Sequence, residues 1–215
     1  MNIDSQTKLF AVIGNPVGHS KSPLIHNLAL QKKEINGVYL AFEVNDVKNS
    51  ITSMKELDIA GYSVTIPHKL EVMKYLDEID PAAKRIGAVN TVHNKNGKLI
   101  GYNTDCFGAI NALKQKTDLA NKRVYLIGNG GVARAIITGL VDAGAKVKVF
   151  CREQDNPEAF AEEFNSEYGL IKDVDSNFDI LINATSVGFS AIHPLIKNDN
   201  ILTFQIFESS ARYKD

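Results

Sequence analysis

The sequence has few cysteines and no excess of charge of either sign. Its two cysteines, Cys106 and Cys151, cannot form a disulfide framework and suit a reducing compartment, so we expect a cytoplasmic protein. The 24 basic residues nearly balance the 25 acidic ones, which argues against nucleic acid or an anionic membrane as a partner. No apolar run could span a bilayer, and the first residues, MNIDSQTK, lack the apolar core of a secretory signal. A small molecule remains as the expected partner.

Motifs of two common enzyme classes are also missing. The five histidines show no spacing typical of metal ligands, so we expect no metal site. No G-x-S-x-G motif is present to indicate a serine hydrolase. Cys106 follows an aspartate into a predicted helix, and we interpret it as a packing residue rather than a nucleophile.

Strand-like and helix-like patterns alternate along the chain. Strands are predicted at 9–14, 38–44, 61–67 and 123–127, helices at 22–33, 47–57 and 105–115, and a hairpin that turns at 95–97. Asp80 and Pro81 together predict the start of a further short helix. This alternation predicts an α/β protein with largely parallel sheets. A turn-rich stretch at 116–122 precedes a fresh βαβ unit, so we expect a first domain at 1–105, a linker helix at 106–118 and a second domain at 119–215.

A glycine pattern lies between the strand RVYLI and the helix VARAIITGLVDAG. Gly128, Gly130 and Ala133 fill G-x-G-x-x-G/A in the context that this pattern requires. The first glycine permits a tight turn, the second lets the backbone approach a pyrophosphate, and the helix N-terminus attracts its charge. An ordinary tight βα turn is the alternative interpretation. We favour dinucleotide binding.

The strand after this helix ends with Cys151, Arg152 and Glu153. A site for NAD would place an acidic residue at the strand end, where it accepts hydrogen bonds from the ribose 2′-hydroxyl. Arg152 could instead pair with a 2′-phosphate, although the carboxylate of Glu153 beside it would repel that group. We therefore expect NADP rather than NAD.

Polar residues follow several predicted strands of the first half. They are Ser20 and Ser22, Thr65 and Lys69, Asn90, and Asn103 with Asp105. Each has a structural alternative: Ser22 could merely cap a helix that has Pro23 at its first position, and Lys69 could be a solvated charge. Because the carboxyl ends of strands in an α/β sheet face one crevice, the set together predicts a binding site.

The chain resembles the shikimate dehydrogenase family. The resemblance rests on GNPVGHSKSP, VTIPHK, GAVNT, GYNTD, GNGGVARA and NATSVGF, which occur in the family's order from about Phe10 to Gly188. It implies an N-terminal substrate-binding domain, a C-terminal Rossmann-like domain that binds NADP, and the interconversion of 3-dehydroshikimate and shikimate in aromatic amino acid biosynthesis.

The resemblance also implies a role for each motif residue. Lys69 and Asp105 match the catalytic pair, Ser20 and Ser22 the groups that hold the substrate carboxylate, and Thr65 and Asn90 those that hold ring hydroxyls. Gly128, Gly130, Gly131 and Ala133 match the pyrophosphate loop, Arg152 the 2′-phosphate contact, and Thr185, Ser186 and Gly188 the segment near the nicotinamide. Lys69 would donate a proton to the alkoxide that hydride transfer creates, and Asp105 would position it.

Two features depart from the family's pattern. Ser63 replaces an asparagine, and the chain ends about fifty residues before family members usually do, in keeping with ordinary domain sizes. We therefore expect a shortened second domain, impaired activity, and apolar surface that favours a homodimer. Two alternatives stay open: a shikimate/quinate-type dehydrogenase with relaxed specificity, and a non-catalytic protein that binds nucleotide or shikimate.

Overall fold

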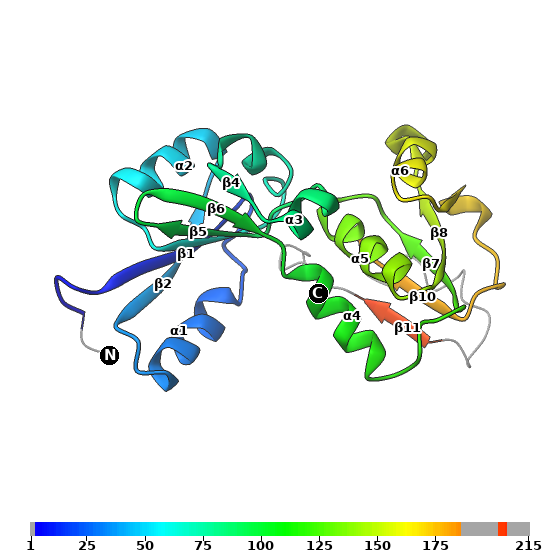
Figure 1. The fold of residues 1–215 in the computed structure, drawn as a ribbon, viewed down its shortest axis with the longest axis horizontal. Coiled ribbons are helices and arrows are strands. Elements are labelled where there is room, and N and C mark those ends of the chain that lie inside the picture. The colour runs from blue at the N-terminus through cyan, green and yellow to red at the C-terminus, as the bar shows by residue number, and fades with distance from the viewer. Residues whose placement is uncertain (1–2, 186–201, 206–215) are drawn as a thin grey trace. The chain divides into compact units, whose positions relative to one another are not determined.

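The chain divides into two compact units, Met1–Asn103 and Thr104–Asp215, and each has its own β-sheet (Figure 1). The structure, a computed structural model, describes residues 3–185 and 202–205. Helices and strands alternate in both units, so the predicted α/β class is confirmed. None of the helices in the described ranges is both long enough and apolar enough to cross a bilayer.

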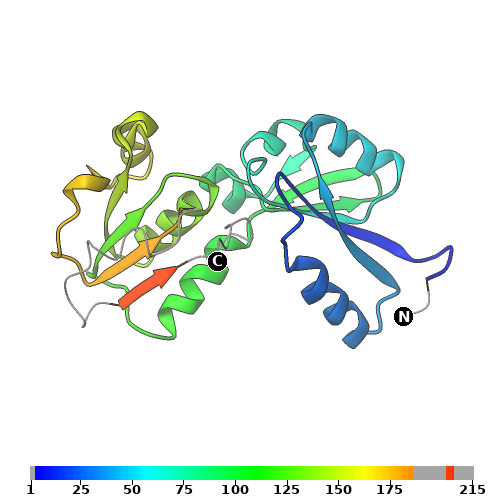
Figure 2. The same cartoon turned by 180° about the vertical axis from the view of Figure 1, so that it is seen from behind.

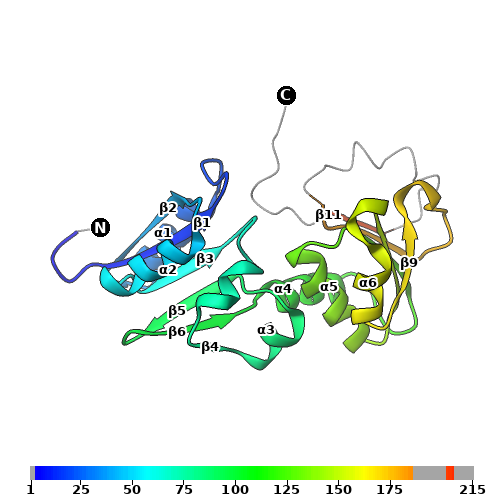
Figure 3. The same ribbon diagram turned by 90° about the horizontal axis from the view of Figure 1, so that it is seen from above.

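The sheet of the first unit has six strands. In spatial order they are β2 (Gly37–Glu43), β1 (Lys8–Gly14), β3 (Gly61–Val64), β5 (Thr91–Lys95), β6 (Lys98–Tyr102) and β4 (Glu78–Ile79). β1 pairs in parallel with β2 and β3, whereas β5 is antiparallel to both of its neighbours. The tight turn between β5 and β6 confirms the predicted hairpin (Figure 3).

Two helices cover opposite faces of this sheet (Figure 1). α2 (Val47–Glu56) buries Val47, Ile51 and Met54 in the larger core of the unit, and the Asp46 carboxylate accepts the Asn49 N–H at its start (3.0 Å). α1 (Ser22–Lys32) has no buried residue, and only its partly buried Leu30 joins a small cluster around Val12 and Tyr39. The α1 face of the sheet is therefore thinly covered.

α1 begins at Ser22 and α3 (Pro81–Ile86) at Pro81, as predicted, and the Asp80 carboxylate accepts the Ala82 N–H (2.9 Å). The structural alternative for Ser22, that it merely caps α1, does not hold: Lys21 has the cap position, and the Ser20 hydroxyl accepts the Ser22 N–H (3.2 Å). A short 3₁₀ helix, η1 (Glu71–Tyr75), follows the VTIPHK segment.

The second unit contains a five-stranded parallel sheet in the order β11-β10-β7-β8-β9 (Figure 2). Its elements are α4 (Asp105–Lys114), β7 (Arg123–Ile127), α5 (Gly131–Asp142), β8 (Lys146–Cys151), η2 (Glu153–Asp155), α6 (Pro157–Glu163), β9 (Glu167–Leu170), η3 (Ile171–Asp173), β10 (Ile180–Asn183) and β11 (Leu202–Gln205). The chain winds outward from β7 to β9 and then returns to β10 on the other side of β7. This reversal is the switch point of a Rossmann-like sheet, as predicted.

α4 and α5 pack against each other through a position without a side chain. A Cβ atom on Gly139 would lie 2.3 Å from Ile110 Cγ1 and 2.9 Å from Cys106 Sγ, so any larger residue would force these side chains to move. Ile110 and Leu113 of α4 thereby join the core beneath the sheet. Cys106 lies in this contact, which agrees with its interpretation as a packing residue.

We expect Gly139→Ala to lower the free energy of unfolding by about 1–3 kcal/mol, because the added methyl overpacks the α4–α5 contact. Gly108→Ala is the matched control: it lies in α4 with no atom within 4 Å of its Cβ position, and helix propensity should make it stabilising by about 0.5–1 kcal/mol. Urea unfolding of both variants measures the difference. Equal stabilities would contradict the packing described here.

Candidate functional site

Backbone hydrogen bonds gather three loops of the first unit at one edge of its sheet. The Thr65 N–H donates to the Ile13 carbonyl (2.9 Å), the Val64 N–H to the Asn90 carbonyl (2.7 Å), and the Asn90 N–H to the Tyr102 carbonyl (3.0 Å). The carboxyl ends of β1, β3 and β6 and the start of β5 therefore meet there. This brings together the predicted residues Thr65 and Asn90, and the Asn103 amide adds a bond to the Ala88 carbonyl (2.9 Å).

The VTIPHK segment is buried at this edge. Thr65, His68 and Lys69 are 6%, 4% and 6% exposed. The His68 Nε2–H donates to the Val44 carbonyl (2.7 Å), and the Lys69 carbonyl accepts the Val89 N–H (2.9 Å). A buried lysine with a fixed backbone is not the solvated surface charge that served as the alternative interpretation. His68 was not predicted as part of the site, because its contact with the loop after β2 has no local sequence signal.

The hydroxyl of Thr65 has no hydrogen-bond partner among the residues that the structure describes, although its oxygen is fully buried. An unsatisfied buried hydroxyl costs about 1–3 kcal/mol, so such a group suggests a ligand that completes it. Nearby, the Thr91 hydroxyl donates to Asn90 Oδ1 (2.9 Å), which fixes the orientation of the Asn90 amide. The edge thus combines an ammonium, a hydroxyl and an oriented amide.

Ser20 lies half-buried in the loop between β1 and α1, and Ser22, also half-buried, is the first residue of α1. The Ser20 N–H donates to the Val17 carbonyl (2.9 Å), and its hydroxyl accepts the Ser22 N–H. Asn27 holds the next turn of α1 against β2 by two hydrogen bonds with the backbone of Tyr39 (2.8 and 2.9 Å). Both hydroxyls are therefore held at the N-terminus of α1.

In the second unit, the glycine loop lies at the switch point of the sheet. Gly128 has φ +111°, and a Cβ there would lie 3.1 Å from Thr185 Cγ2 and 3.2 Å from the Ala184 carbonyl, so the loops after β7 and β10 are neighbours. Among the described residues, no atom outside the neighbouring backbone lies within 4 Å of the Cβ position of Gly130, the cap residue of α5. The loop thus presents open space before the first turn of α5. Ala133, fully buried, holds this helix against the sheet.

The loop after β10 is organised by a buried asparagine. Asn183 is completely buried, and its Oδ1 accepts both the Thr185 N–H (3.0 Å) and the Thr185 hydroxyl (2.7 Å). Thr185 therefore has a fixed position beside Gly128. Ser186 and Gly188, predicted for the same segment, lie outside the described residues.

Arg152 follows β8 as predicted, but its guanidinium is paired. Its Nε and one terminal nitrogen donate to the two carboxylate oxygens of Asp155 (2.8 and 3.0 Å). Asn129 of the glycine loop donates to the Asp155 carbonyl (2.8 Å). The sequence drew attention to Glu153, and the structure shows that Asp155 is the acidic residue in contact with Arg152.

The two predicted catalytic residues belong to different units. Lys69 lies in the first unit, and Asp105 is the first residue of α4 in the second, where a carboxylate also stabilises the helix N-terminus. Across the described part of the chain, no three histidine, cysteine, aspartate or glutamate side chains gather as metal ligands would.

Two family models match the chain. The shikimate dehydrogenase substrate binding domain matches residues 12–92, and the shikimate / quinate 5-dehydrogenase model matches residues 111–207. A shikimate dehydrogenase (NADP(+)) of Methanococcus maripaludis is 42% identical, over 99% of this chain and 79% of its own length.

Solved structures of shikimate dehydrogenases are also similar to this chain. The crystal structure of shikimate dehydrogenase from Aquifex aeolicus has a TM-score of 0.89 at 37% identity, covering 95% of this chain and 80% of its own. A shikimate dehydrogenase in complex with NADP+ has a TM-score of 0.81 at 36% identity, covering 95% of this chain and 78% of its own. The motifs, the two folds and these similarities together show that the chain belongs to the shikimate dehydrogenase family.

Proposed function

We propose that the protein catalyses the NADP-dependent, reversible reduction of 3-dehydroshikimate to shikimate. The observation that carries this proposal is the buried edge of the first sheet, where Lys69 lies on one short segment with Thr65, whose hydroxyl has no hydrogen-bond partner among the described residues. Relatives named shikimate dehydrogenase (NADP(+)) support the same reaction.

The glycine loop of the second unit fits a dinucleotide. The open space at Gly130 would admit a pyrophosphate, and the first N–H groups of α5, together with Gly128 and Gly131, would hydrogen-bond to it. Arg152 would face the 2′-phosphate, and Thr185, Ser186 and Gly188 would lie toward the nicotinamide. When bound, NADPH supplies the hydride.

Lys69 manages the proton in this proposal. Reduction of a ketone leaves negative charge on its oxygen, and the ammonium of Lys69 would donate a proton there while stabilising that charge. In the reverse direction the neutral amine would accept the proton from the substrate hydroxyl. Asp105 would position this lysine and the hydroxyl.

The remaining residues would orient the substrate. Ser20 and Ser22, at the N-terminus of α1, would hydrogen-bond to its carboxylate, which the positive end of the helix also attracts. Thr65 and Asn90 would bind ring hydroxyls. Quinate shares the carboxylate and ring hydroxyls, and the family model of the second unit names both substrates, so quinate is the second candidate.

We expect Lys69→Met to lower kcat for shikimate oxidation by about 10²–10⁴, because it removes the proton-transferring group while keeping the buried volume. The affinity for NADPH, measured by its fluorescence, should not change. Lys74→Met, at an exposed lysine of η1, is the matched control and should keep the wild-type rate.

A near-normal rate for Lys69→Met would refute the catalytic assignment. Wild-type protein that binds shikimate and NADP without turnover would support the non-catalytic alternative instead. Ligand-induced rises in melting temperature distinguish that case from a failure to bind.

We expect Thr65→Val to weaken shikimate binding by about tenfold, the value of one hydrogen bond, with little loss of stability. The reason is that the Thr65 hydroxyl has no partner in the described structure to lose. Thr138→Val is the control: its hydroxyl donates to the Arg134 carbonyl (2.8 Å), so this variant should lose about 1 kcal/mol of stability. Calorimetric titration measures the affinity of each variant for shikimate, and urea unfolding measures its stability. A strongly destabilised Thr65→Val would contradict the assignment of Thr65 to substrate binding.

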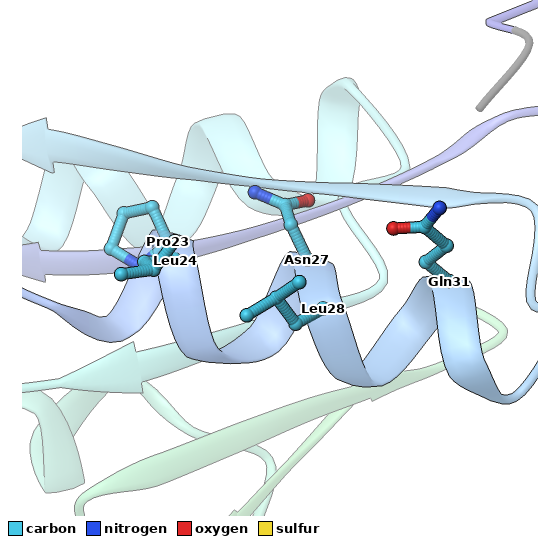
Figure 4. A pocket seen from close by; sticks show the side chains of 5 residues that line it. All are labelled: Pro23, Leu24, Asn27, Leu28 and Gln31. Atoms are coloured by element: carbon cyan, nitrogen blue, oxygen red, sulfur yellow. The ribbon is translucent and has the colours of Figure 1, made fainter.

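We also propose a homodimer formed through α1. Leu24, Ile25 and Leu28 of this helix are 63%, 61% and 51% exposed. Figure 4 shows Leu24 and Leu28 on one side of α1, beside a pocket of about 300 Å³ that Pro23, Asn27 and Gln31 also line. Exposed apolar residues that cluster in this way are typical of interaction surfaces. A second copy would bury them around a two-fold axis.

We expect the double variant Leu24→Glu/Leu28→Glu to be monomeric in light scattering after size exclusion, whereas wild type should have the mass of a dimer. The reason is that the dimer would have to bury the two new carboxylates of each copy in an apolar contact, and removing them from water is costly. Leu57→Glu, at an exposed leucine beyond α2 (69% exposed), should remain dimeric. A monomeric wild type, or a dimer that survives the double change, would refute this interface.

Cytoplasmic location stays part of the proposal. Neither Cys106 nor Cys151 forms a disulfide bond in the described structure, Cys151 is buried, and burial raises the pKa of its thiol. A less ionised, buried thiol is unreactive. These thiols agree with a reducing compartment.

A further inference from the structure

The structure shows that the arginine expected to bind the 2′-phosphate is occupied by a carboxylate. Arg152 and Asp155 form a two-point pair, in which one edge of the guanidinium meets both carboxylate oxygens. The hydrogen bonds from Arg152 lower the pKa of the Asp155 carboxyl, so it is ionised at neutral pH. A 2′-phosphate that approaches this arginine therefore meets a pair with no net charge.

The carboxylate is the better anchored partner. The Asp155 side chain is 22% exposed and that of Arg152 is 65% exposed. The backbone of Asp155 is held on both sides, since its N–H donates to the Arg152 carbonyl (3.0 Å) and its carbonyl accepts the Asn129 amide (2.8 Å). Asn129 belongs to the glycine loop, so its hydrogen bond fixes the backbone of Asp155 beside that loop.

A guanidinium has five N–H donors, and this pair uses one of its edges. The remaining edge can still face a phosphate, but Asp155 opposes the charge of that phosphate at close range. For an unphosphorylated ribose the same pair has no such cost, and a carboxylate is the usual acceptor for a 2′-hydroxyl.

We propose that Asp155 is a specificity-determining residue that weakens the preference for a 2′-phosphate, so that the protein accepts NAD as well as NADP. This inference rests on the proposed cofactor site. Asp155 acts mainly by holding Arg152, and the two residues lie together in the turn beyond β8.

The test is calorimetric titration of the full chain with two nucleotide fragments, adenosine 2′,5′-bisphosphate and adenosine 5′-monophosphate. Asp155→Asn keeps the shape of the side chain and removes its charge. It should tighten binding of the bisphosphate by about fivefold, as for an exposed ion pair, and leave the monophosphate nearly unchanged. The gain should shrink as salt is raised from about 0.1 to 1 M, where the screening length falls from about 10 to 3 Å.

Two further variants identify the cause. Glu153→Gln removes the same charge at an exposed neighbour, whereas the guanidinium of Arg152 is bonded to Asp155, and it should change neither affinity. Arg152→Gln should weaken the bisphosphate, and in that background Asp155→Asn should give little gain. Melting temperatures equal to wild type exclude misfolding.

Equal effects of Asp155→Asn and Glu153→Gln, or weaker bisphosphate binding by Asp155→Asn, would overturn the inference. A gain that persists without Arg152 would overturn the ion pair as its cause. If wild type binds neither fragment, the cofactor site itself fails and the inference fails with it. If wild type binds each of the two fragments but does not turn over shikimate, the proposed activity is refuted and this inference stands.

Discussion

The parallel pairing of β1 with β3 is the constraint on which the buried edge around Thr65 and Lys69 depends. The pair continues one residue beyond β3, where the Thr65 N–H reaches the Ile13 carbonyl. Gly14 makes this approach possible, because a Cβ there would lie 2.3 Å from the Thr65 side chain. A shift of one residue in this register would turn Thr65 toward the opposite face of the sheet.

In the second unit, a glycine likewise lets two loops approach each other. At its switch point, Gly128 has a left-handed backbone and lies against the loop after β10. Asn183 then holds Thr185 through two hydrogen bonds. In each unit, a glycine brings two loops close together, and a buried polar side chain fixes one of them.

Much of the fold and of the candidate site could be predicted from the sequence, because the sequence patterns that indicate them are local. Strand alternation, the Asp80–Pro81 helix start and the glycine pattern each depend on neighbouring residues. Other points were left open by the sequence and were decided by the course of the backbone. The alternative in which Ser22 merely caps α1 is excluded only by the structure, where Lys21 has the cap position and the Ser20 hydroxyl accepts the Ser22 N–H. Glu153 and Asp155 are equally acidic in sequence, and the 3₁₀ turn of η2 decides which one reaches Arg152.

Each hydrophobic cluster lies wholly within one unit: the clusters around Val89 and Val12 in the first, and those around Ile136 and Phe150 in the second. Chains with separate cores need not melt as one cooperative block. The two units can therefore unfold at different temperatures, so a single melting temperature need not describe the stability of the whole chain.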